Sequence, residues 1–402
     1  IGSSDQEIIT SGDREVDAYF MELSVPILST LEAQVAVRRE EFSTGQSSTD
    51  PKYGLTWAAT DWLTLRGTHG TAFIAPTLPQ LLNPVTCGLS TVTDRFGPHD
   101  AFTTACSGGN PNLDNETSES TSFGFDVNVG DFRMSLTYNN TQFENRIIST
   151  SGQDIMAFDF ANFQAATGFT GDGLSPDTRP SLEQLTAWVN DPRSSDLIIR
   201  DPNDLRTILQ VNGLGAGNAE TVEVTAYDLQ ANYTYSTNNW GDFRVGLQGT
   251  YIDEFLYQSR PDDPVTDAAG KYNDQTGAAP ELPQLKANLN IGWTMGNHSL
   301  TTITRYVDDL NYDGPLFTHL DFFANTFRPG NIAETGVKAW TQLDANYTYR
   351  GIDLWDGELS FTVGGRNLTD REPQRSPEFA GVMGALHDPL NRVFFARAVY
   401  DF

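Results

Sequence analysis

The strongest constraint on the fold of this chain is a two-residue alternation of apolar and polar side chains. In the segment LPQLKANLNIGW, five apolar positions alternate with five polar or small ones; the apolar set is Leu285, Ala287, Leu289, Ile291 and Trp293. Successive side chains of a β-strand point to opposite faces. The segment therefore predicts a strand with one apolar and one polar face.

The same alternation recurs along the whole chain and predicts about 13 strands. Their expected spans are 14–25, 31–44, 51–59, 61–73, 116–129, 131–147, 219–236, 241–257, 281–295, 298–311, 337–350, 356–367 and 391–402. Several exceed the roughly 5–6 residues typical of strands in globular proteins. They match the length of about 9–11 residues that a tilted transmembrane β-strand needs.

The connections between these strands mostly alternate between short and long. The long ones span about 74–115, 148–218, 258–280, 312–336 and 368–390, and the connection at 45–50 is the exception. Short turns on one rim and long loops on the other are typical of an outer-membrane barrel. A secreted β-sandwich or solenoid with one wet face is the alternative, since half-buried antiparallel sheets also alternate. It offers no reason for this sorting of the loops.

Composition excludes two classes of protein. The chain has 402 residues, is 38% hydrophobic and carries a formal net charge of −28. Nucleic acid is an unsuitable partner, because its recognition requires a basic surface. There is no apolar run near the roughly 20 residues of a membrane helix. The negative charge is best interpreted as acidic, solvated loops.

The two cysteines, Cys87 and Cys106, flank one Gly-, Ser- and Thr-rich segment and predict a disulfide in an oxidising compartment. Zinc is the weaker alternative, because His99 is the only histidine nearby and there is no CxxC pair. The five histidines are scattered, and no Ser/His/Asp cluster can be assembled from the motifs. We therefore expect no metal, no cofactor and no enzymatic activity.

The insert 148–218 contains one helical pattern, SPDTRPSLEQLTAWVNDP. Ser181 is the expected N-cap, and Leu182, Leu185 and Val189 share one face. Pro192 lies beyond the helix end. We expect a short helix folded over the mouth of the barrel.

Several motifs along the chain resemble those of one family. Phe73, Ala75 and Pro76 fit a Gly-Phe-Arg-Ala-Pro segment, with Ile74 where arginine is usual. GNPNLDNETSES resembles a Gly-Asn-Pro-x-Leu strand entry, and GGRNLTDREP resembles an Asn-Leu-Phe-Asp-x-x-Pro signature with Thr369 in place of phenylalanine. Together with the ending NRVFFARAVYDF, these segments are similar to the TonB-dependent receptors of the Gram-negative outer membrane.

The resemblance implies an all-β fold, an antiparallel transmembrane barrel of 22 strands with long extracellular loops. Residues 1–402 would be its carboxy-terminal portion, roughly strands 10 to 22. The plug domain and the first nine strands would belong to the same precursor or to a second chain, with any cut before Ile1. We expect an integral outer-membrane protein in contact with lipid and lipopolysaccharide.

The family implies a receptor that takes up a large, scarce nutrient, such as a siderophore or metal chelate, cobalamin, an oligosaccharide or a peptide. The TonB complex would act on it through the plug. The alternative is a structural or adhesion barrel that binds a partner protein or a surface layer.

Two sets of residues are candidates for these roles. The loop aromatics could stack on a ligand, or could simply pack within the loops: Phe96, Phe102, Tyr257, Phe317, Phe322 and Phe379. In the last strand, Phe394, Tyr400 and Phe402 would form the barrel-closing signal that the resemblance implies. Their side chains, with Ala396 and Ala398, should face lipid. Aromatic residues near strand ends, among them Tyr233, Tyr251 and Trp293, predict two interfacial bands.

Overall fold

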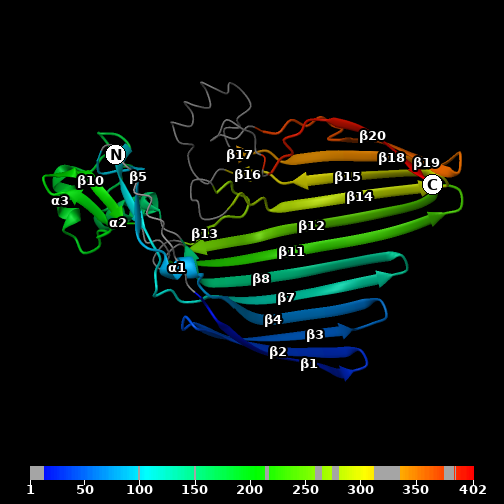
Figure 1. Cartoon of the computed structure of the whole chain (residues 1–402), viewed down its shortest axis with the longest axis horizontal. Coiled ribbons are helices and arrows are strands. Elements are labelled where there is room, and N and C mark those ends of the chain that lie inside the picture. Colours follow the sequence, from blue (N-terminus) through cyan, green and yellow to red (C-terminus); the bar gives the residue numbers. More distant parts are fainter. Residues whose placement is uncertain are drawn as a thin grey trace.

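The computed structural model describes residues 13–97, 100–148, 151–212, 217–258, 265–273, 280–311, 336–374, 384 and 386–402. Thirteen antiparallel strands pair in chain order into one sheet (Figure 1). They are β1 (Val16–Leu28), β2 (Leu31–Phe42), β3 (Ser47–Ala58), β4 (Leu63–Ile74), β7 (Glu116–Val129), β8 (Phe132–Ile148), β11 (Gly217–Thr237), β12 (Gly241–Gln258), β14 (Leu285–Met295), β15 (His298–Val307), β18 (Trp340–Leu354), β19 (Gly357–Arg366) and β20 (Val393–Asp401). Each corresponds to one predicted strand. A two-residue strand, β13 (Thr266–Asp267), adds to β12.

The register of the sheet gathers the apolar side chains on one face. Because paired residues of an antiparallel ladder point the same way, one continuous apolar row runs through Trp57, Leu65, Phe125, Leu136, Leu229, Gly249 and Ala287. The adjacent row points to the other face and is largely polar: Thr56, Arg66, Gly124, Thr137, Asp228, Thr250 and Lys286. The alternation visible in single strands is thus kept in phase across the sheet.

Hydrogen bonds between strands organise the polar face. Arg66 donates from Nε to Asp126 over 3.2 Å and from Nη2 to Ser135 over 2.9 Å. Gly124 lies under this guanidinium, and a Cβ added there would come within 2.9 Å of Arg66 Cζ. The missing side chain therefore makes room for arginine, which is a use of glycine where other groups approach the backbone closely.

The loops are sorted as the sequence predicts. The short connections 29–30, 59–62, 130–131, 238–240, 296–297 and 355–356 all lie at one rim, on the right in Figure 1. The long connections lie at the opposite rim, together with the short one at 43–46. Gly130 (φ 56°) and Gly296 (φ 53°) supply the left-handed backbone conformation that two of the tight turns need. We refer to the opposite end of the sheet as the long-loop rim.

Aromatic side chains form two bands on the apolar face. Near the short-turn rim, Tyr233 and Tyr235 stack with ring centroids 6.3 Å apart. Toward the long-loop rim, Tyr227 lies between Tyr138 at 5.4 Å and Tyr251 at 6.4 Å. Tyr227 and Tyr233 are six residues apart in β11, about 20 Å at about 3.3 Å per residue. Because barrel strands are tilted by about 35–45°, this separation corresponds to about 15 Å along the membrane normal, within the apolar band of about 25 Å of outer-membrane barrels.

Four of the five last-strand residues that are expected to face lipid share one face of the sheet. Phe394, Ala396, Ala398 and Tyr400 pair with Gly365, Val363, Phe361 and Leu359, which places them on the apolar face. Phe402 is fully exposed, and its ring stacks against Tyr400 at 6.1 Å. β20 and β1 form the two ends of the strand order. Among the described residues, neither has a partner strand on its outer side.

No helix within the described ranges is long and apolar enough to span a membrane.

Candidate ligand-binding lobe at the long-loop rim

The two longest connections fold together into one compact unit, which we call the outer lobe (residues 86–107 and 152–212). Its four-stranded sheet has the order β5 (Thr86–Thr93), β6 (Asp100–Ser107), β10 (Asp204–Asn212), β9 (Ile198–Asp201). Two helices pack with it, α2 (Gly152–Thr167) and α3 (Leu182–Val189). A one-turn helix, α1 (Leu78–Leu82), lies where the lobe meets the rim (Figure 1).

The predicted disulfide is present. Cys87 and Cys106 are direct cross-strand partners of β5 and β6, with an S–S distance of 2.07 Å. The bond therefore fastens the hairpin at the end nearest the barrel rim. Beyond this hairpin, β6 pairs in parallel with β10, which joins the two loops into one sheet.

One helix of the lobe was predicted and the remaining elements were not. α3 begins at Leu182, and Ser181 is its N-cap as the sequence predicts, forming a capping box with Gln184. Helix α2 shows a weaker signal, in which Met156, Phe160 and Phe163 follow one another at spacings of four and three residues. That spacing, followed by Gly168 at φ 69°, would have identified a helix and its end.

Phe96 does not offer a surface to a ligand. It is 1% exposed and packs edge-on against Phe160 and Phe163, with ring centroids 5.2 and 5.1 Å away. Leu185 and Trp188 of α3 complete this aromatic core. Of the two roles considered for Phe96, ligand contact and packing within the loops, the structure shows packing. Removing its ring from water stabilises the lobe.

The other candidate aromatics divide in the same way. Tyr257 is buried against Val222 and Ala268 at the rim and is likewise a packing residue. Phe102 is 69% exposed on β6 and stays a candidate for ligand contact. Phe317, Phe322 and Phe379 lie outside the described residues.

A buried ion pair joins the two loops. Arg200 of β9 donates to both carboxylate oxygens of Asp94 over 2.8 and 3.0 Å, and to the carbonyl of Leu205 over 3.1 Å. Both side chains are almost completely buried. The guanidinium also lies 5.4 Å from the ring centroid of Phe96. This bidentate geometry is the strong form of an Arg–carboxylate contact.

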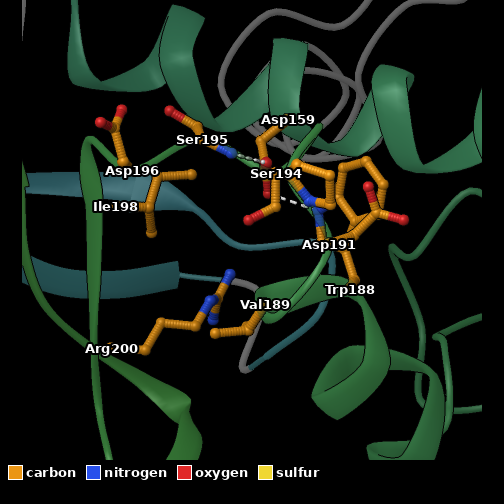
Figure 2. A pocket seen from close by; sticks show the side chains of 10 residues that line it. Asp159, Trp188, Val189, Asp191, Ser194, Ser195, Asp196, Ile198 and Arg200 are labelled. Carbon is orange, nitrogen blue, oxygen red and sulfur yellow. Dashed lines mark hydrogen bonds between the residues drawn. The ribbon is translucent and has the colours of Figure 1, made fainter.

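Beside this pair, the lobe contains a pocket of about 460 Å³ between α2, the end of α3 and the segment 191–200 (Figure 2). Its lining includes Asp159, Trp188, Val189, Asp191, Ile198 and Arg200. The volume falls in the range of about 300–1,000 Å³ that is usual for small-molecule sites. Its lining mixes charged and polar side chains with the apolar ones of Trp188, Val189 and Ile198.

Asp159 is the buried carboxyl of the pocket. Its Oδ2 accepts a hydrogen bond from Trp188 Nε1 over 3.1 Å, and its Oδ1 accepts one from the Ser195 backbone N–H over 2.8 Å. Burial raises its pKa above the ordinary value of an aspartate, against the opposing effect of these hydrogen bonds. By contrast, hydrogen bonds from Arg193 lower the pKa of Asp191 to about 2.

A second packed cluster lies at the rim above β18 and β19. His387 stacks on Trp340 with ring centroids 4.6 Å apart, and its Nδ1 accepts a hydrogen bond from the Gln374 backbone N–H over 3.1 Å. Asn367, fully buried at φ 51°, bonds through its side chain to both backbone groups of Arg371. The Asn-Leu motif thus ends β19 and fixes the start of the last loop.

Acidification is expected to loosen this cluster through His387. Burial lowers the pKa of His387, so the folded cluster retains the neutral ring while the unfolded chain binds a proton below about pH 6.5. Its contribution to stability is therefore present above about pH 6.5 and falls as the pH drops toward the lowered pKa. Intrinsic amide exchange is base-catalysed and slows as the pH falls. Between neutral pH and pH 5, exchange of the Gln374 amide should therefore slow less than the intrinsic rate does, because the cluster opens more often.

The substitution His387→Phe is the matched control, because it keeps a ring on Trp340 and removes the titrating group. Neighbouring Asp388 changes little in this window, because hydrogen bonds from the Leu390 backbone N–H and Gln342, together with the charge of Arg366, lower its pKa. Equal pH dependence in the variant and the parent protein would show that His387 is not responsible.

Comparison with known proteins shows where this architecture recurs. A family model described as "TonB dependent receptor-like, beta-barrel" matches residues 2–368. The siderophore receptor PirA from Acinetobacter baumannii is similar in structure, with a TM-score of 0.60 at 13% identity over 98% of this chain and 47% of that one. A mutant of the ferric enterobactin receptor PfeA from Pseudomonas aeruginosa has a TM-score of 0.58 at 15% identity. The similarity covers 96% of this chain and 45% of the receptor chain.

The chain thus spans a little under half the length of these structures. A search of curated proteins gave no match. In the part of the chain that the structure describes, no three His, Cys, Asp or Glu side chains are grouped closely enough to hold a metal ion.

Proposed function

Because this chain belongs to the TonB-dependent receptor-like β-barrel family, we propose that residues 1–402 form the carboxy-terminal portion of the barrel of an outer-membrane active transporter. The observation that carries the proposal is the continuous apolar face, flanked by two aromatic bands, on thirteen strands of 9–21 residues. Strands of this length cross a bilayer when tilted. The polar face then lines the lumen.

The two outer edges of the sheet support a barrel that other strands complete. An unpaired strand edge in lipid leaves backbone groups without hydrogen bonds, which costs several kcal/mol for each group. The remaining strands and the plug would come from the same precursor or from a second chain. The energy-coupling TonB complex would act through that plug, as is usual for the family.

We propose a siderophore-type ferric chelate as the cargo. The support comes from the similar structures, which are a siderophore receptor and a ferric enterobactin receptor. The outer lobe and the other long connections would meet the ligand first, because the long-loop rim of such barrels faces outward. Phe102 offers an exposed ring there.

Uptake measurements test this function. Deleting the gene that encodes this chain is expected to abolish accumulation of one class of ⁵⁵Fe-chelate, and a protonophore should abolish the same uptake in the parent strain. Vitamin B12 and maltodextrin uptake in the same cells are the specificity controls. Unchanged uptake of every ferric chelate, with loss of attachment to a surface or partner protein, would favour the structural barrel instead.

A further inference from the structure

The charges around the lobe pocket are balanced at every buried position except one. Arg200 is neutralised by its two hydrogen bonds with Asp94. Asp191 accepts from Arg193 Nε over 2.9 Å and from Nη2 over 2.7 Å. The exposed carboxylate of Asp196 points away from Asp159 in Figure 2.

Asp159 is the exception. It is 5% exposed, and within the described ranges no Lys, Arg or His lies within 4.0 Å of its carboxylate as an ion-pair partner. Its two hydrogen-bond donors, an indole N–H and a backbone N–H, are both neutral. Burying a carboxylate without an ion-pair partner is costly. Burial raises the pKa of Asp159 despite its two hydrogen bonds and the attraction of Arg200, which is itself paired with Asp94.

The carboxylate retains acceptor capacity. Each oxygen accepts one hydrogen bond from the protein, whereas the two oxygens together can accept about four. The carboxyl group lines the pocket. An added cation there would gain a charge-assisted hydrogen bond, which is roughly twice as strong as a neutral one.

The remaining lining selects the kind of cation. Val189, Pro192 and Ile198 contribute apolar surface to the lining that an alkyl chain can contact. A divalent metal ion is disfavoured, because no group of three ligating side chains is assembled in the described part of the lobe. An anion is disfavoured by the surplus of carboxylates.

We infer that the pocket of the outer lobe binds the ammonium group of a small aliphatic primary amine, with Asp159 as its counter-ion and the apolar side chains of the lining in contact with the alkyl chain. This site is separate from the barrel lumen. It does not depend on the proposed transport of a ferric chelate.

Calorimetric titration of the complete receptor in detergent with n-butylammonium chloride at pH 7.5 tests the inference. Saturable binding at millimolar concentration is expected, and 1-butanol, which has the same chain without the charge, should bind at least tenfold more weakly. Asp159→Asn should weaken n-butylammonium binding at least tenfold. Asp177→Asn removes an exposed carboxylate elsewhere in the lobe and should leave binding unchanged.

Two further measurements do not rely on Asp159→Asn folding correctly. Val189→Trp is expected to fill the pocket and abolish binding while Asp159 keeps its hydrogen bonds. In the unaltered protein, affinity should fall as the pH drops through the pKa of Asp159, because the protonated acid loses its charge. Absence of binding, equal binding of 1-butanol, or unchanged affinity in Val189→Trp would each overturn the inference. The titration has no uptake step, so its outcome is independent of the transport function.

Discussion

Replacing Arg200 with methionine is expected to lower the free energy of unfolding of the outer lobe by about 3–5 kcal/mol, the usual cost of removing one partner of a buried ion pair. Asp94 would then be fully buried without a cation, and the carbonyl of Leu205 would lose a donor. The aromatic core would also lose the guanidinium above Phe96. Because Asp94 and Arg200 come from different loops, the effect should extend over both halves of the lobe.

Hydrogen exchange resolved by segment is the appropriate measurement, because local opening of the lobe can be separated from the strands of the barrel. Amides of α2, α3 and β10 should exchange faster, while those of β11 and β12 should not change. The double variant Asp94→Leu with Arg200→Met is the matched control and should recover most of the loss, since an apolar pair of similar volume is often tolerated. Equal loss in the single and double variants would mean that packing, and not the unpaired charge, accounts for the effect.

Placing arginine on the apolar face is expected to destabilise the barrel by about 2–4 kcal/mol if that face contacts lipid. Leu247 lies in β12 between Ala231 and Leu289 on this face. In Leu247→Arg, the charge would lie near the middle of the membrane-spanning part of β12. Folding of the complete receptor into lipid vesicles, followed by the shift from unfolded to folded mobility on unheated gels over a urea series, measures the loss.

The neighbouring residue provides a stringent control. Gln248 points to the polar face, where it pairs with Gln230 and Asn288, and Gln248→Arg places the same charge on that face. This variant should fold like the unaltered receptor. If Leu247→Arg and Gln248→Arg lost similar amounts of folding stability, the assignment of the faces would be wrong. The two positions are adjacent in one strand and differ in which face of the sheet they occupy.

The barrel wall was predictable from sequence because its signal is local. The strand expected at 116–129 is β7, Glu116–Val129, and the others agree within a few residues. A period of two residues is visible within any one strand. The ends of the strands are also marked locally, by the turn glycines Gly130 and Gly296. The loop sorting and the orientation of the last strand follow from these positions alone.

The outer lobe was not predictable in the same way. Its sheet depends on the parallel pairing of Thr104 with Gln210, more than a hundred residues apart. Phe96 is a loop aromatic in sequence, and only its contact with Phe160 and Phe163 makes it a core residue. The pocket likewise exists only because α2, α3 and β9 meet.

The sequence by itself determined the strands, their two faces, the disulfide between Cys87 and Cys106 and the family resemblance, because each depends on residues close together along the chain or on a simple count. The tertiary structure decided which loop residues are core and which are surface, and it placed Asp159 in a pocket where it has no ion pair with any described residue. The physical reason is that burial and charge pairing in the lobe arise between two separate loops, whose association no local pattern encodes.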